Sequence, residues 1–282
     1  MEFNFEHQPG MFVYDRKLVT SGVPKVSIIT PFYNGAKTIE QTFNCVVNQT
    51  FPWFEWIIVN DGSTKKEDVK FLEKLAERDP RVRVVHKENG GISTARNYGV
   101  RCAKTEYLLP LDCDDLIEPT FVEYCWWMLE KNPKAAWAYT DSVGFGDEEY
   151  LWNHTFNPEL LKKENHLTAT ALIRRDWYEK VGGYAETEKH YNEDWFFWLQ
   201  ILAQGGYPVQ AQGGEYQFWY RRTNTGVLSI VKGKEEQAKK NRKMIENAAK
   251  DVIDPHEPVI YPKVKFNYTA PKFTEWNKSI YK

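Results

Sequence analysis

The chain has 282 residues, of which 42% are hydrophobic and 27% charged, which suits one large α/β domain with a small addition, or two modest domains. Its 37 basic and 39 acidic side chains leave a formal net charge of −2, so no general basic field favours nucleic acid. No apolar run approaches the roughly 20 residues that cross a bilayer, and the polar first ten residues do not resemble a secretory signal. We therefore expect a cytoplasmic protein whose four cysteines are free thiols.

From residue 26 onward, short β-branched apolar runs alternate with segments in which apolar residues recur at helical spacing. Continuous apolar runs of this kind are typical of buried parallel strands. Strands that alternate with helices in this way predict βαβ units and an α/β fold built on a mostly parallel sheet. The predicted strands are Val26–Thr30, Trp56–Val59, Val82–Val85 and Tyr107–Leu111, and the predicted helices lie within Ala36–Val47, Val69–Leu75, Ile92–Ala103 and Phe121–Glu130.

After residue 134 the alternation becomes less regular. We expect a strand over Ala135–Val143, a strand followed by a helix within Leu172–Val181, a helix over Asp194–Leu202 that begins at Asn192 or Glu193, and one or two strands within Tyr207–Tyr220. The predicted organisation is a leader over residues 1–23, an α/β domain over 24–231, and a helix with an extended tail over 232–282.

The predicted helix Lys232–Lys250 carries seven Lys or Arg residues and three Glu residues. A basic helix of this kind can lie on anionic lipid, which would give the protein a peripheral membrane contact. Its apolar face is weak, with only Ala238, Met244, Ile245 and Ala248. A solvated helix is therefore the favoured interpretation.

Acidic residues follow two of the predicted strands, at the edge where ligands bind in such sheets. Asp112, Asp114 and Asp115 crowd three carboxylates into four residues after the fourth strand, and Asp61 follows the second. Crowded carboxylates need a compensating cation, and oxygen ligands suit Mg²⁺ or Mn²⁺ completed by phosphate oxygens. The alternative is that these residues only cap helices and form turns.

Three further sites each have a functional and a structural interpretation. Arg96 has the planar donor fork that suits bases and phosphates, or it is an exposed arginine. Glu193 and Asp194 stabilise a helix N-terminus, or one of them is a general base. Arg221 and Arg222 follow an aromatic strand, where they stabilise a leaving diphosphate or face solvent.

Taken in order, five segments resemble the family 2 glycosyltransferases of the GT-A fold, over roughly residues 24–230. The segments are Val26–Asn34 (VSIITPFYN), Ile57–Thr64 (IIVNDGST), Asn89–Asn97 (NGGISTARN), Leu111–Asp115 (LDCDD) and Asn192–Leu199 (NEDWFFWL). Thr170–Tyr184 and Tyr220–Ser229 also resemble later stretches of that family. The late loop departs from the family pattern, because Arg222 and Thr223 stand where a histidine often follows the arginine.

The resemblance implies a role for each matching residue. Asp61 would bind the nucleotide base in a pocket lined by Thr30, Pro31 and Tyr33. Arg96 would contact the base or the diphosphate, and Arg221 or Arg222 would face the diphosphate. Asp112 would face the ribose and Asp114 would reach the metal, with Asp115 able to share either task. Asp194 would be the catalytic base, with Glu193 as the second candidate.

The implied activity is an inverting, metal-dependent glycosyl transfer from a nucleotide-diphosphate donor to an acceptor hydroxyl. The resemblance favours a UDP-sugar as donor, a glycan, polysaccharide or lipid-linked intermediate as acceptor, and Mn²⁺ or Mg²⁺ as cofactor. A nucleotidyltransferase is one alternative, but Thr30–Asn34 is not the glycine-rich basic loop it would need. A catalytically silent subunit that binds nucleotide sugars is another. We expect the loops within Thr140–Thr168 and the C-terminal tail to select the sugar and the acceptor.

Overall fold

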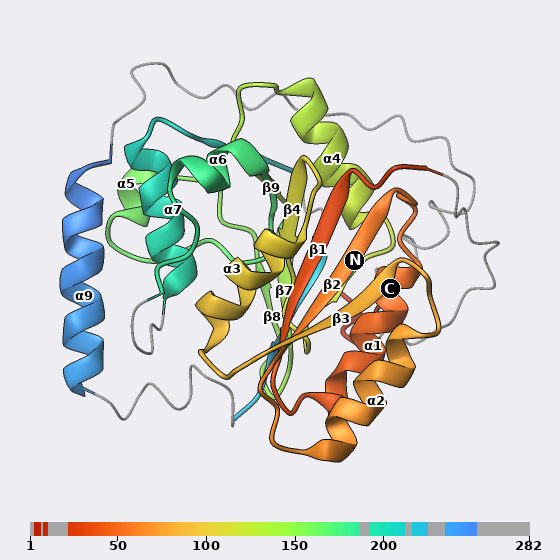
Figure 1. Ribbon diagram of the computed structural model, residues 1–282. Coiled ribbons are helices and arrows are strands. Elements are labelled where there is room, and N and C mark those ends of the chain that lie inside the picture. The colour runs from red at the N-terminus through yellow and green to blue at the C-terminus, as the bar shows by residue number, and fades with distance from the viewer. Residues whose placement is uncertain are drawn as a thin grey trace.

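The computed structural model describes residues 3–6, 8–10, 22–186, 192–211, 216–224 and 235–252. A large mixed sheet lies at the centre with helices on both faces, and α9 (Glu235–Lys250) runs along the outside of α7 (Glu193–Ala203), as Figure 1 shows. The strands of this sheet, in spatial order, are β10 (Pro208–Gln210), β6 (Trp137–Tyr139), β9 (Leu172–Arg174), β4 (Tyr107–Pro110), β1 (Val26–Phe32), β2 (Phe54–Asp61) and β3 (Val82–Lys87).

Most neighbouring strands of the large sheet are parallel. β1 pairs in parallel with β2 and β4, β2 with β3, and β10 with β6, whereas β9 is antiparallel to both of its neighbours. The prediction of a mostly parallel α/β sheet flanked by helices is confirmed. The carboxyl ends of β1, β2, β3 and β4 therefore meet at one edge.

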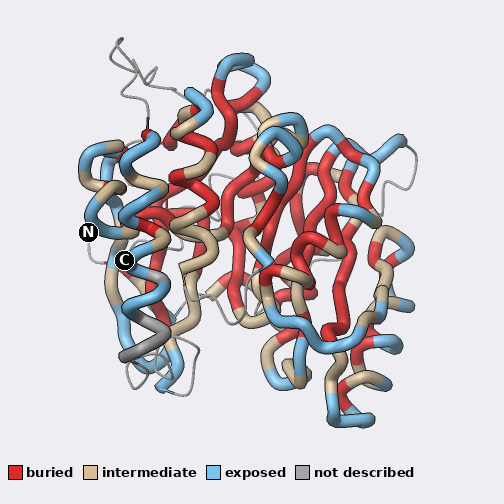
Figure 2. The backbone as a smooth tube through the Cα atoms, turned by 60° about the vertical axis from the view of Figure 1, so that its left-hand side comes forward, coloured by how far each residue is buried: buried red, intermediate tan, exposed pale blue. Residues whose placement is uncertain are grey.

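Alternate residues of the central strands point into two different hydrophobic cores. Ile28 and Ile58 belong to a core completed by α1 (Ala36–Val47), α2 (Lys66–Ala76) and α4 (Phe121–Lys131). Ile29 and Ile57 belong to the other core, completed by α3 (Ile92–Cys102), α5 (Pro158–Leu161), α6 (Arg175–Lys180), α7 and α9. This period of two is the side-chain geometry of a strand buried on both faces, and Figure 2 shows these strands as the buried centre of the molecule.

A second, smaller sheet has the order β5 (Leu116–Ile117), β11 (Tyr216–Arg222), β7 (Asp141–Gly146) and β8 (Tyr150–Trp152). The single strand predicted over Ala135–Val143 is wrong in this respect, because β6 ends at Tyr139 in the large sheet and β7 begins at Asp141 in the small one. The apolar sequence of this segment contains no signal for the point at which the chain passes from the large sheet to the small one. The short elements β5, β8 and α5 were not predicted from the sequence.

The two ends of the chain contribute to the cores where the structure describes them. Phe3 packs edge-on against Tyr216, with ring centroids 5.5 Å apart. Ile245 and Val252 are buried in the second core, so the apolar face of α9 packs against the domain. A membrane contact of α9 would then rest on its basic side chains alone. The expected tail beyond residue 252, most of the leader and residues 232–234 lie outside the described residues.

No helix within the described ranges combines the length and the apolar character needed to cross a bilayer. The four cysteines lie in the described part of the chain and are free thiols, as predicted.

Candidate active site

The acidic loop Asp112–Asp115 lies between β4 of the large sheet and β5 of the small one. It shares the carboxyl edge of the parallel strands with the turn after β1 and with Asp61 at the end of β2. Ligands of open α/β sheets bind at this edge.

Arg96, on α3, joins the acidic loop to the N-terminus of α7. Its guanidinium donates through Nη2 to Asp112 Oδ1 and through Nη1 to Glu193 Oε1, each at 2.7 Å. The same group lies over the ring of Tyr184, 5.2 Å from the centroid. Arg96 is 1% exposed, and only a planar fork can serve two carboxylates in this way. Its predicted contact with a base or diphosphate stays untested, and here its guanidinium is engaged by two protein carboxylates.

Asp114 and Asp115 have different surroundings. Asp115 is buried, and its Oδ1 accepts a hydrogen bond from the Arg221 amide at 2.8 Å. Burial and the charges of Asp114 and Asp112 raise the pKa of Asp115 well above its ordinary value. Asp114 is half-buried, and burial together with the charge of Asp112 raises its pKa to about 6. Asp112 and Asp114 are therefore the two partly accessible acids of the loop, and of these Asp112 is paired with Arg96.

Arg221 and Arg222, at the end of β11, bind different parts of the molecule. Arg221 donates to the backbone oxygen of Asp114 and to Gln41 Oε1, both at 2.7 Å, and its guanidinium lies over Phe145. It therefore fixes the acidic loop against α1. Arg222 donates to the exposed Glu148 at 3.0 Å, at the rim of the small sheet.

The acids at the start of α7 also differ. Glu193 is paired with Arg96, whereas Asp194 Oδ2 accepts a hydrogen bond from Asn165 Nδ2 at 3.1 Å and its Oδ1 accepts one from the Trp195 amide at 2.8 Å. Burial and, secondly, the charge of Glu193 raise the pKa of Asp194 above the ordinary carboxyl range. A carboxylate with increased proton affinity, and with no ion-pair partner among the residues that the structure describes, is suited to remove a proton.

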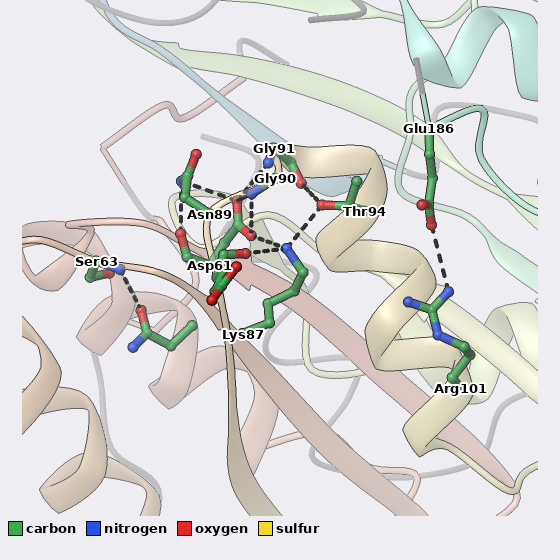
Figure 3. A network of polar contacts seen from close by, with 11 residues as sticks. Asp61, Ser63, Lys87, Asn89, Gly90, Gly91, Thr94, Arg101 and Glu186 are labelled. Carbon is green, nitrogen blue, oxygen red and sulfur yellow. Dashed lines mark hydrogen bonds and ion pairs between the residues drawn. The ribbon is translucent and has the colours of Figure 1, made fainter. Parts of the chain in front are cut away.

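Asp61 is held by the loop that follows β3, as Figure 3 shows. Its Oδ1 accepts from Lys87 Nζ at 2.5 Å and from the Gly90 amide at 3.1 Å, and its Oδ2 accepts from the Gly91 amide at 2.8 Å. Asn89 Nδ2 donates to the Asp61 backbone oxygen at 2.7 Å. Both carboxylate oxygens are thus occupied by the Lys87–Gly91 loop, and the predicted contact with a nucleotide base stays a prediction.

The residues expected around the base divide into one core residue and two accessible ones. Thr30 is buried and its hydroxyl accepts a hydrogen bond from Trp56 Nε1 at 2.8 Å, so this side chain points into the core. Tyr33 is 50% exposed on the turn after β1. Pro31 is half-buried on the opposite face of the strand from Thr30.

Sequence reasoning missed several side chains that order this region. Asn97 ties α3 to the segment before α7, donating to the Tyr184 backbone oxygen and to Glu186, each at 2.8 Å. Asn165 reaches Asp194 from a loop 29 residues earlier in the chain. Burial and the charges of Asp115 and Asp112 raise the pKa of Tyr220. Polar residues of these types are common in loops, and no sequence spacing marks their partners.

The described residues contain no preformed cluster of three His, Cys, Asp or Glu side chains that would hold a metal ion. Mg²⁺ typically binds one or two protein carboxylates and takes its other ligands from water and substrate phosphates. The acidic loop fits that mode, because Asp112 is paired with Arg96 and Asp115 with the Arg221 amide, which leaves the Asp114 carboxylate for a cation. A groove of about 580 Å³ between α7 and α9, lined by Phe196 and Met244 among others, includes none of the predicted donor residues.

The mostly parallel sheet, with acids at its carboxyl edge, has the architecture expected of a GT-A fold. The model of the family described as "Glycosyl transferase family 2" matches residues 27–197, and the chain belongs to this family. The resemblance stated from the sequence motifs is thereby confirmed.

Among relatives, the hyaluronan synthase of Pasteurella multocida is 37% identical over 191 residues, which cover 64% of this chain and 19% of the synthase. An uncharacterized glycosyltransferase, EpsJ, of Bacillus subtilis is 32% identical over 177 residues, covering 62% of this chain and 46% of that protein. The chain therefore spans less than half the length of these relatives.

Two solved structures share the fold. TarS 1-349 of S. aureus in complex with UDP-GlcNAc aligns with a TM-score of 0.62 at 20% identity, covering 73% of this chain and 60% of that one. The mannosyltransferase PcManGT of Pyrobaculum calidifontis, in complex with GDP-Man and Mn²⁺, aligns with a TM-score of 0.59 at 16% identity, covering 86% and 72%. These similarities confirm the GT-A fold.

Proposed function

We propose that this chain transfers a sugar from a nucleotide-diphosphate donor to an acceptor hydroxyl, with inversion at the anomeric carbon. The observation that carries the proposal is the bridge Asp112–Arg96–Glu193, which ties the donor-side acids to the start of α7. The bridge joins the acidic loop to the N-terminus of α7, where Asp194 follows Glu193, which supports a shared site. Family membership and the nucleotide-sugar complexes of the structural neighbours support a nucleotide-sugar donor.

In this mechanism Asp194 takes the proton of the acceptor hydroxyl while the acceptor oxygen attacks the anomeric carbon. The bond from that carbon to the diphosphate oxygen breaks, and the electron pair leaves with the diphosphate. A single displacement of this kind inverts the anomeric centre. Asp194 suits the base role better than Glu193, because Glu193 is neutralised by Arg96 whereas the pKa of Asp194 is raised.

Asp114 would hold the divalent cation, Mn²⁺ or Mg²⁺, whose role when bound is to neutralise charge on the leaving diphosphate. Asp112, oriented by Arg96, would face the ribose. Arg221 stands beside the same loop, where its positive charge favours an anionic leaving group. A UDP-sugar donor and an acceptor that is a glycan, polysaccharide or lipid-linked saccharide complete the proposal, supported by the UDP-GlcNAc complex of one structural neighbour.

A donor panel tests this function. UDP- and GDP-sugars are incubated with the protein and Mn²⁺, and the released nucleotide and the sugar product are identified. We expect release of nucleoside diphosphate from one donor class. Sugar-dependent release of pyrophosphate from a nucleoside triphosphate would indicate a nucleotidyltransferase instead. Tight donor binding with no release, in the presence of an acceptor panel, would indicate a silent binding subunit.

The metal assignment has a separate test. Asp114→Asn should abolish Mn²⁺-dependent donor binding in titration calorimetry, because the accessible carboxylate is lost. Asp115→Asn should retain it, since an amide oxygen can still accept the hydrogen bond from the Arg221 amide. Loss of binding in Asp115→Asn with retention in Asp114→Asn would reverse the assignment.

A further inference from the structure

One face of the small sheet carries aromatic side chains over a floor of small residues. Along the register, Tyr220 of β11 lies opposite Gly144 of β7, which lies opposite Tyr150 of β8. Ser142 of β7 lies opposite Trp152 of β8 on the same face, because paired residues and residues two apart share a face. A Cβ on Gly144 would come within 2.2 Å of the Tyr150 ring. The Tyr150 ring therefore lies directly on the backbone of β7.

The aromatic row continues along β8 from Tyr150 to Trp152 and reaches His154 just beyond the end of the strand. The ring centroids of Tyr150 and Trp152 are 6.1 Å apart, and those of Trp152 and His154 are 4.9 Å apart. Tyr150 and Trp152 are half-buried, and His154 is exposed. These rings therefore keep some accessible surface, and β8 is an edge strand in the described part of the small sheet.

The row connects the two halves of the candidate active site. At one end, Tyr150 lies across Gly144 from Tyr220, the residue before Arg221, whose amide donates to Asp115. Further along, Trp152 Nε1 donates to the backbone oxygen of His166 at 3.0 Å. The residue before His166 is Asn165, which donates to Asp194. The row therefore runs from the donor-side acids to the loop that holds the proposed base.

A recess of about 10 Å³, with room for about one water molecule, lies beside Trp152 and His154 and is also lined by His166 and Thr168. It is too small for a sugar ring, so a saccharide can only lie over these side chains. His166 is buried, and its Nε2 accepts a hydrogen bond from the Asn157 amide. Its Nδ1 is enclosed by the protein and not open to a ligand.

We propose that Tyr150, Trp152 and His154 form the platform on which the acceptor saccharide lies. Aromatic faces offer large rigid apolar surface at little entropic cost, which matches the C–H face of a sugar ring. A ring over Trp152 and His154 would place a hydroxyl toward Asp194, because Trp152 is hydrogen-bonded to His166 and the preceding residue, Asn165, is hydrogen-bonded to Asp194. This inference rests on the proposed glycosyl transfer and identifies where its acceptor binds.

Saturation-transfer NMR tests the platform without knowledge of the natural acceptor. The protein, with UDP and Mg²⁺, is mixed with cellotetraose, chitotetraose and hyaluronan tetrasaccharide, and its aromatic protons are irradiated. We expect transfer to at least one oligosaccharide, and a loss of that signal of tenfold or more in Trp152→Ala and His154→Ala. Transfer to none of the three in the wild type, or undiminished transfer in both variants, would overturn the proposal.

Leu151→Ala is the matched control, since Leu151 is 41% exposed on the other face of the same strand. It should bind oligosaccharide as the wild type does. If Trp152→Ala proves unfolded by circular dichroism, His154→Ala decides alone, because its side chain is exposed. Calorimetry with UDP-sugars separates the two proposals: donor binding without a saccharide signal contradicts the platform only, and absence of donor binding contradicts the proposed function.

Discussion

Arg96 is the residue on which the arrangement of the site depends most. Two partly buried carboxylates, Asp112 and Glu193, would repel each other without the guanidinium between them. A buried charge set of this kind adds little net stability when complete, but removing one partner leaves uncompensated charge. The bridge therefore acts mainly to fix positions, and its loss should affect both folding and transfer.

Replacement of Arg96 by Ala should lower the free energy of unfolding by about 3–5 kcal/mol, the range for breaking a buried ion pair. Arg96→Lys should recover only part of this, because an ammonium group lacks the fork that reaches both carboxylates. Chemical denaturation measures the effect. Arg101→Ala is the control on the same helix, since the Arg101 side chain is 61% exposed. Equal free energies of unfolding for Arg96→Ala and Arg101→Ala would show that the bridge contributes nothing to stability.

The raised pKa of Asp194 predicts how the rate depends on pH. A protonated Asp194 cannot accept the proton of the acceptor hydroxyl, so the rate should rise as pH increases through a pKa that lies above the ordinary carboxyl range. Asn165 donates to the ionised form and so lowers this pKa. Asn165→Ala should therefore move the acidic limb of the kcat profile to higher pH. If the acidic limb of the kcat profile does not move, Asp194 is not the group whose ionisation limits the rate at low pH.

At the scale of elements, the loop between β3 and α3 is fixed by one carboxylate. The Asp61 carboxylate accepts hydrogen bonds from the amides of Gly90 and Gly91 and from the ammonium of Lys87. Gly91 has φ +90°, which glycine adopts without steric cost and other residues rarely adopt.

Asp61→Asn should loosen this loop, because an amide presents one acceptor oxygen where the carboxylate presents two. A hydrogen bond lost from a buried group costs about 1–3 kcal/mol. We expect faster hydrogen exchange at the Gly90 and Gly91 amides, with the amides of β1 unchanged as an internal reference. Lys87→Met should have a smaller effect on these two amides, since it keeps both carboxylate oxygens as their acceptors and removes only the bonds of the ammonium to Asp61, Glu88 and Thr94. Unchanged exchange in Asp61→Asn would show that the loop is held by other contacts.

The elements that the sequence predicted correctly are those with a strong local signal. Buried strands such as Val26–Phe32 and helices with clear periodicity such as Ala36–Val47 depend on nearby residues, and the strand-end acids followed from the topology. The contacts of Arg96 were not predictable, because Glu193 lies 97 residues away and either residue alone resembles a solvated charge. The small sheet escaped prediction for a similar reason: β5 and β8 have two and three residues, too few to show a period.

At the scale of the whole molecule, the C-terminal helix shares a core with the predicted domain 24–231. Ile245 and Val252 are buried in the second core with residues of α7, so we propose that α9 folds with that domain. α7 carries Glu193 and Asp194 at its N-terminus, so packing of α9 on α7 supports the helix that presents the proposed base.

Ile245→Ala tests whether α9 folds with the domain. Removing a buried Ile side chain costs about 2–5 kcal/mol, and that cost should fall on the main cooperative unfolding transition because α9 and α7 share one core. Lys243→Ala, at an exposed position on the same helix, should leave the transition unchanged. Denaturant melts followed by tryptophan fluorescence and by circular dichroism should then coincide in the variant. A main transition at its wild-type midpoint, with early loss of helical signal alone, would mean that α9 unfolds separately and that the domain keeps α7 in place without it.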